Sequence, residues 1–242
     1  MSLKSLGSLA VGSAGVAAAW HAAPAIAALG PLRRLTMRRL GGIGASDHVA
    51  LTFDDGPDPA STPRFLSLLA EHGVRATFFM LGMMAVEARE LVAEVAGAGH
   101  EVAVHGWEHR MLLKRPPRAT VDDITRAHDL LAELTGTPPR WYRPPNGVLT
   151  GGALVAVRRL GMTPVLWTAW GCDWTRGATP TSIRTHVERQ LRGGSTVLLH
   201  DSDRTSAPGS WHATLAAVPP LLERIGELGL RVGPLGEHGL AA

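Results

Sequence analysis

From residue 48 onward, short apolar runs alternate with longer stretches in which apolar residues recur every three or four positions. The short runs have the length and composition of buried strands, and the longer stretches have the periodicity of amphipathic helices. The predicted strands are His48–Phe53, Ala76–Met80, Glu101–Val104, Trp141–Arg143, Pro164–Thr168, Thr196–Leu199 and Leu230–Val232. The predicted helices lie near Pro63–Glu71, Glu87–Ala98, Val121–Thr135, Gly152–Leu160, Pro180–Arg192 and Thr214–Leu228.

Alternation of this kind favours an α/β fold with a parallel sheet. Roughly seven strand–helix units suit a small βα barrel that is closed or nearly closed, and an open doubly wound sheet is the alternative. Both architectures place active sites at the carboxyl ends of the strands. For the helix starts, Thr62 and Thr179 are predicted N-caps because each precedes a proline, and Thr120 with Asp123 resembles a capping box.

The first 30 residues are apolar, and their one formally charged side chain is Lys4. They resemble a signal peptide or a membrane anchor, although Pro24 and the arginines after the segment oppose export. An Ala-rich helix packed on the domain is the alternative. We predict a secreted or membrane-anchored extracellular protein, with a cytoplasmic location as the alternative. Residues 31–45 are interpreted as a linker, 46–235 as one domain and 236–242 as a C-terminal tail.

Composition narrows the function classes. The net charge is only +3, and Lys4 and Lys114 are the only lysines, so no dense basic patch indicates a nucleic-acid partner. A single cysteine, Cys172, excludes an internal disulfide framework and a cysteine-rich zinc cluster. We expect a monomer with no nucleic-acid partner.

Two adjacent carboxylates, Asp54 and Asp55, follow the first predicted strand, and Gly56-Pro57 ends that strand. Neighbouring residues of an extended chain point in different directions, so one acid could bind a metal while the other accepts a proton. A plain Asp-Gly-Pro turn is the alternative.

Two histidines, His105 and His109, follow another predicted strand. In a helical turn their spacing would place both imidazoles on one face, where they could bind one ion with a carboxylate. Neutral imidazole suits zinc and other divalent first-row metals. Two histidines with structural partners on a loop are the alternative.

Three further stretches carry candidate chemistry. Arg143 precedes a rigid Pro-Pro-Asn-Gly loop in which Asn146 could face a developing oxyanion. His200 ends an apolar strand and could serve as a general acid, because its pKa lies near working pH. Trp167, Trp170 and Trp174 could form a platform for sugar rings, with core packing as the alternative.

In this order, Thr52-Phe-Asp-Asp-Gly-Pro57, His105-x-x-x-His109, Arg143-x-Pro-x-Gly147 and Leu199-His200-Asp201 resemble the motif set of the NodB-homology polysaccharide deacetylases, carbohydrate esterase family four. The resemblance covers about residues 46–235. It implies a distorted seven-stranded (β/α) barrel as a single catalytic domain, a divalent metal such as zinc or cobalt, and hydrolysis of N- or O-acetyl groups on polysaccharides.

The resemblance also implies roles for individual residues. The catalytic residues would be Asp54 as general base, His200 as general acid and Arg143. The metal ligands would be Asp55, His105 and His109. The substrate-binding residues would be Asn146, Asp173, Trp174 and Leu198, with the backbone amide of Asn146 as oxyanion donor and Leu198 in the acetyl-methyl pocket.

Three positions depart from the family pattern. Gly106 replaces a serine or threonine, which removes a hydroxyl beside the ligands. Asn146 replaces an aromatic residue. Trp170 stands where a carboxylate is expected to tune the catalytic histidine, so that carboxylate is either missing or supplied by another residue.

The resulting prediction is a metal-dependent deacetylase acting on an N-acetylated polysaccharide, such as a cell-wall glycan or a chitin-like polymer. One alternative is the same metal chemistry on a non-sugar amide or ester. The other is a non-catalytic glycan-binding relative that keeps the fold.

Overall fold

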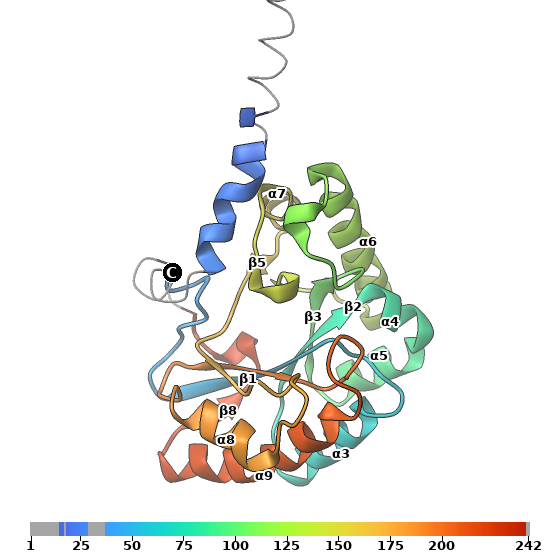
Figure 1. The fold of residues 1–242 in the computed structure, drawn as a ribbon. Coiled ribbons are helices and arrows are strands. Elements are labelled where there is room, and N and C mark those ends of the chain that lie inside the picture. Colours follow the sequence, from blue (N-terminus) through green and yellow to red (C-terminus); the bar gives the residue numbers. More distant parts are fainter. Residues whose placement is uncertain (1–14, 17, 29–36, 241–242) are drawn as a thin grey trace, which may run out of the picture.

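The computed structural model describes residues 15–16, 18–28 and 37–240. Within them, parallel strands form one sheet in the order β5-β4-β3-β2-β1-β7-β6, and β8 pairs with the first half of β1. Figure 1 shows how the strands and helices are arranged in space. The strands are β1 (His48–Asp54), β2 (Thr77–Leu81), β3 (Glu101–Gly106), β4 (Trp141–Tyr142), β5 (Thr163–Pro164), β6 (Ala169–Trp170), β7 (Thr196–His200) and β8 (Arg231–Gly233). The prediction of a distorted, barrel-like α/β domain is confirmed.

Helices connect most successive strands, although none lies between β5 and β6, and they cover the outside of the sheet. They are α3 (Thr62–Glu71), α4 (Gly82–Glu87), α5 (Arg89–Gly97), α6 (Pro117–Thr135), α7 (Gly151–Arg159), α8 (Pro180–Glu188) and α9 (Ser210–Glu227). Short 3-10 turns occur at η1 (Ala23–Ala28), η2 (Leu112–Lys114), η3 (Pro145–Gly147) and η4 (Leu235–Glu237).

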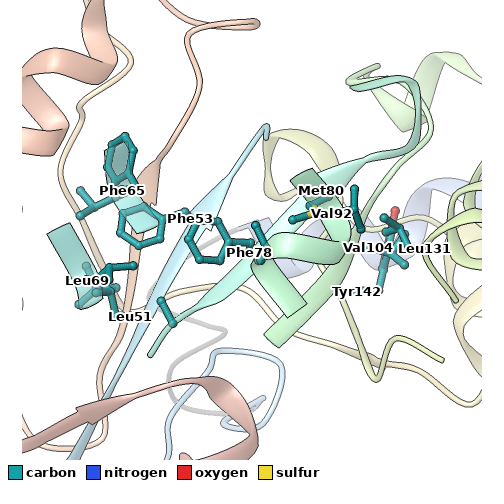
Figure 2. Packing of buried hydrophobic residues seen from close by; sticks show 14 of the residues in the cluster. Leu51, Phe53, Phe65, Leu69, Phe78, Met80, Val92, Val104, Leu131 and Tyr142 are labelled. Atoms are coloured by element: carbon teal, nitrogen blue, oxygen red, sulfur yellow. The ribbon is translucent and has the colours of Figure 1, made fainter. Parts of the chain in front are cut away.

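Strand β1 is the centre of the sheet and is buried along its whole length. Its odd-numbered residues face the helices, where Phe53 packs 5.1 Å from the Phe65 ring and 5.2 Å from the Phe78 ring (Figure 2). Its even-numbered residues face the inside of the curled sheet, where Ala50 belongs to a smaller apolar cluster. The last inward position is Asp54, so the alternation of the strand delivers a carboxylate to the mouth of the barrel.

The predicted strand Pro164–Thr168 is wrong, because two short strands replace it. The intervening backbone bonds elsewhere: the Leu166 amide donates to the Leu40 carbonyl, and the carbonyls of Val165 and Leu166 accept from the Arg143 guanidinium. Polar contacts with distant segments therefore take the place of the strand ladder between β5 and β6.

Two predicted helix caps are also wrong. The α3 helix includes Thr62, whose hydroxyl donates to Asp201 instead of capping the helix. The α6 helix begins at Pro117, so Thr120 and Asp123 lie inside it. At Thr179 the prediction is confirmed, because its side chain and that of Ser182 form a reciprocal capping box at the start of α8.

Both terminal segments contact the domain where the structure describes them. The His21 ring lies 3.2 Å from the Leu112 carbonyl, and Trp20 lies against Gly151. Of the predicted signal or anchor, residues 1–14, 17 and 29–30 lie outside the described part. Among the described residues, no helix is long and apolar enough to cross a bilayer.

A buried histidine pair joins β1 to the C-terminal residues. The Nδ1 atoms of His48 and His238 lie 2.9 Å apart, and both side chains are fully buried. The pKa of His238 is lowered to about 4, mainly by burial and to a smaller extent by the neighbouring His48 ring. Burial also lowers the pKa of His48. At least one ring is therefore neutral in the folded protein.

This pair predicts a specific loss of stability in acid. The unfolded chain binds more protons than the folded one between pH 6.5 and 4, so stability is present above pH 6.5 and is lost as the pH falls through that window. For His238 the loss is about 3 kcal/mol. We expect the free energies of unfolding of wild type and His238→Gln, measured by urea denaturation, to become more similar as the pH falls from 7 to 4. Parallel pH dependences in the two proteins would contradict this assignment.

Candidate active site

Asp54 and Arg143 form a buried ion pair at the carboxyl end of β1. Arg143 Nη1 donates to Asp54 Oδ1 at 2.7 Å and to Thr52 Oγ1 at 2.8 Å, and the guanidinium lies 4.0 Å from the centroid of Phe79. Burial raises the pKa of Asp54, and the Arg143 charge opposes that rise. The carboxylate is thus held in one orientation, and its second oxygen lies 3.8 Å from His105 Nε2.

Three metal-ligand candidates converge beside this pair. One donor atom each from Asp55, His105 and His109 lies within 4.8 Å of the others. Asp55 Oδ1 is 3.4 Å from His105 Nε2 and 3.7 Å from His109 Nε2. No helical turn joins the two histidines, because His105 is the penultimate residue of β3 and His109 lies in the loop beyond the strand. The loop brings the two rings to 5.2 Å between centroids.

The chemistry of this donor set fits a divalent cation. Asp55 Oδ1 is buried and makes no hydrogen bond in the described part of the structure. His105 Nδ1 donates to the Arg143 carbonyl at 2.8 Å, which fixes its proton there and leaves the Nε2 lone pair facing Asp55. Burial lowers the pKa of His105 to about 3, so the ring is neutral, as a ligand must be.

His200 stands on the other side of Asp55, at the end of β7. Its Nδ1 donates to Asp173 Oδ1 at 3.0 Å, and its backbone amide donates to Asp173 Oδ2 at 2.7 Å. Burial lowers the pKa of His200, but the carboxylate of Asp173 and those of Asp55 and Asp54 outweigh it and raise the pKa to about 10. The imidazolium therefore keeps a proton on Nε2, which lies 4.0 Å from Asp55 Oδ2.

Asp173, predicted from the family resemblance to bind substrate, is a hydrogen-bond partner of His200 in the structure. Its side chain is fully buried, and its carboxylate accepts from His200 and from Thr214 Oγ1, so it lies behind the His200 ring. In the sequence, Trp170 stands where a carboxylate was expected to contact the catalytic histidine, and in the structure Asp173 supplies that carboxylate. Spacing along the chain could not show which acid reaches the histidine, because that depends on the turn after β6.

A pocket of about 240 Å³ opens over these groups. Leu198 and Asn146 line it, with Leu198 buried and the Asn146 side chain exposed in a turn of positive φ. One wall consists of aromatic rings in succession: the centroids of Trp167 and Trp170 are 5.9 Å apart, and those of Trp170 and Trp174 are 5.6 Å apart. Trp174 in turn meets the His200 ring edge-on at 5.5 Å.

The sequence interpretation missed two hydroxyls at this site. Thr205 Oγ1 donates to Asp55 Oδ2, and Thr214 Oγ1 donates to Asp173 Oδ2 at 3.0 Å. Threonines are common in loops and helix starts, so no residue pattern pointed to either of them.

The comparisons with known proteins agree with this arrangement. The family model described as Polysaccharide deacetylase matches residues 42–165. A chitooligosaccharide deacetylase from Bradyrhizobium sp. is 32% identical over 209 residues, which cover 82% of this chain and 93% of that protein.

Two solved structures are similar in fold. The Bc1960 peptidoglycan N-acetylglucosamine deacetylase, in complex with a benzamide, has a TM-score of 0.78 and 27% identity over 88% of this chain and 98% of that chain. A family 4 acetyl xylan esterase from Clostridium thermocellum, in complex with a cobalt ion, has a TM-score of 0.71 and 27% identity over 78% of this chain and 89% of that chain. The chain therefore belongs to the polysaccharide deacetylase family of carbohydrate esterase family four.

Proposed function

We propose that this protein is a metal-dependent deacetylase that hydrolyses the acetamido groups of an N-acetylated polysaccharide. The observation that supports it most directly is the convergence of three groups in one pocket: the Asp55–His105–His109 donor set, the Asp54–Arg143 pair and the His200–Asp173 pair. A binding protein has no need for a ligand set, a base and an acid side by side.

Asp55, His105 and His109 would hold a divalent metal, with zinc or cobalt as the first candidates. Histidine and carboxylate ligands that leave positions open are typical of catalytic zinc sites, and the similar acetyl xylan esterase structure carries cobalt. Such an ion supplies Lewis acidity, which polarises a carbonyl and lowers the pKa of water.

Asp54 would act as the general base. Arg143 occupies its Oδ1, so the other oxygen is directed toward His105 and the ligand set, where water would attack. A carboxylate whose pKa is raised by burial takes up a proton more readily than an exposed one. The proton leaves the attacking water as the carbon–oxygen bond forms.

His200 would act as the general acid. It is protonated, its Nδ1 proton is held by Asp173, and the proton it can donate is the one on Nε2, the atom that lies 4.0 Å from Asp55 Oδ2. Donation of that proton to the sugar nitrogen releases the amine as the carbon–nitrogen bond breaks. The backbone amide of Asn146 would stabilise the developing oxyanion, Leu198 would receive the acetyl methyl group, and Trp174 would contact the sugar.

The substrate would be a cell-wall glycan or a chitin-like polymer. The aromatic wall of Trp167, Trp170 and Trp174 offers apolar faces suited to sugar rings. Proteins similar to this chain in sequence and in structure carry the names of chitooligosaccharide and peptidoglycan deacetylases. Action on such a polymer implies a place outside the cytoplasm.

Acetate release tests the proposal. The full chain, loaded with zinc or cobalt, is expected to release acetate from N-acetylglucosamine oligomers. We expect His109→Ala to lose both bound metal and acetate release, because one of three ligands is removed. Metal analysis and enzymatic acetate determination give the two readouts.

His212→Ala is the matched control, since His212 is an exposed histidine on α9 that stacks on Trp211. It is expected to keep metal and activity. Full metal occupancy in His109→Ala would remove His109 from the site. Acetate from small esters but not from sugar oligomers would indicate a non-sugar substrate, and metal-free protein that binds glycan without hydrolysis would indicate a binding relative.

A further inference from the structure

The loop that joins the two histidine ligands is held from outside by one buried carboxylate. Asp123 lies in the first half of α6 and is 5% exposed. Its Oδ2 accepts a hydrogen bond from the backbone amide of Trp107 at 2.8 Å. Burial raises the pKa of Asp123, while the amides of Trp107 and Glu108 both oppose that rise. The carboxylate thus faces the backbone midway between His105 and His109.

Gly106 leaves the space that this carboxylate fills. Its φ is +104°, a conformation that side-chain-bearing residues rarely adopt, and a Cβ built there would lie 3.0 Å from Asp123 Oδ2. A side chain at residue 106 would therefore be strained and would crowd Asp123, so this backbone disfavours the hydroxyl that the family usually places beside the first ligand. Gly106 and Asp123 are therefore complementary: the loop has no side chain at residue 106, and the Asp123 carboxylate from α6 occupies that space and accepts the hydrogen bond from the loop.

Other contacts from the same region fix the loop and Asp123. Arg115 Nη1 lies 2.7 Å from Asp123 Oδ1 and 3.5 Å from Glu108 Oε2, so it neutralises the buried acid and ties it to the loop. The Arg126 guanidinium, one helical turn beyond Asp123, covers the Trp107 ring at 3.5 Å. The Trp107 carbonyl accepts from the Met83 amide at 3.1 Å.

On the basis of the proposed metal site, we infer that Asp123 is a positioning residue for the two histidine ligands: its carboxylate holds the backbone between them in place of a side chain at residue 106. A loop that is already ordered loses less entropy when it binds an ion. Groups that orient metal ligands typically contribute 10- to 100-fold in affinity. The absence of a hydroxyl at Gly106 is then no sign of a degenerate site.

Cobalt or zinc titration of the full chain by calorimetry tests the inference. Asp123→Ala is expected to weaken metal binding about 10- to 100-fold. Asp123→Asn keeps an acceptor for the Trp107 amide and is expected to lose less. Asp122→Ala is the matched control, because its side chain is exposed on the same helix, and it is expected to bind metal as wild type does.

Hydrogen exchange of the metal-free proteins gives a second readout. Amides of residues 106–110 are expected to exchange faster in Asp123→Ala than in wild type, and at the wild-type rate in Asp122→Ala. Wild-type affinity and wild-type exchange in a folded Asp123→Ala would overturn the inference. Should that variant fail to fold, Asp123→Ser decides by the same exchange measurement, because the serine hydroxyl lies one bond short of the position of the accepting Oδ2 atom: faster exchange supports the inference, and unchanged exchange overturns it.

Failure of the inference can be told apart from failure of the proposed function. If the wild-type chain binds no metal, the proposed function is lost, yet exchange in the metal-free loop still reports whether Asp123 orders it. If the wild type binds metal and all variants bind it equally, the proposed function survives and Asp123 is only a structural residue.

Discussion

Asp54→Asn is expected to lower kcat for deacetylation by about 10²- to 10⁴-fold while the metal still binds. The amide oxygen of asparagine can still accept from Arg143 Nη1, which now bonds Asp54 Oδ1 at 2.7 Å, so the fold around the site should persist. What is lost is the ability to take a proton from water. Steady-state acetate release with zinc or cobalt, together with metal content, measures the two effects separately.

The adjacent residue supplies the comparison. Asp55→Asn is expected to lose metal first and activity as a consequence, because Asp55 Oδ1 faces both His105 Nε2 and His109 Nε2. The same change from aspartate to asparagine should therefore leave the metal bound when it is made at residue 54 and release the metal when it is made at residue 55. If Asp54→Asn loses the metal and Asp55→Asn retains it, the roles of the two carboxylates are exchanged. If Asp54→Asn keeps normal turnover, another group is the base.

The sequence was sufficient to predict which residues meet at this site. Asp54, His105 and His200 each lie at or next to the carboxyl end of a strand of one parallel sheet, and such ends lie together at one edge. The register adds what the sequence lacks: Asp54 is paired directly with His200 across β1 and β7. The motif order therefore predicted the members of the site, and strand pairing determines their distances.

The sequence was insufficient wherever a polar contact with a distant segment decides the outcome. The apolar run 164–168 has strand composition, but in its middle the Leu40 carbonyl takes the Leu166 amide and the Arg143 guanidinium takes two carbonyls, which interrupts the strand. Thr62 precedes a proline as an N-cap would, but its hydroxyl bonds Asp201, a residue 139 positions away. Local propensity cannot anticipate partners of this kind.

Arg143→Met is expected to cost about 3–5 kcal/mol of unfolding free energy in the metal-free protein, the largest loss of stability that we predict for a single change. Arg143 is fully buried and donates to Asp54, Thr52 and the carbonyl of Leu166. Methionine fills similar volume but leaves the Asp54 charge buried without its partner. Urea denaturation in the presence of a chelator measures the loss without the contribution of bound metal.

A second substitution tests whether the unpaired charge is the cause. Asp54→Asn in the Arg143→Met background is expected to restore part of the lost stability, because a buried amide costs less than a buried carboxylate. Arg140→Met is the control: this arginine is exposed three residues earlier and should change stability by less than about 0.5 kcal/mol. Strictly additive losses for Arg143→Met and Asp54→Asn would show that the two side chains are not coupled, and the ion pair would then not be what holds the base in place.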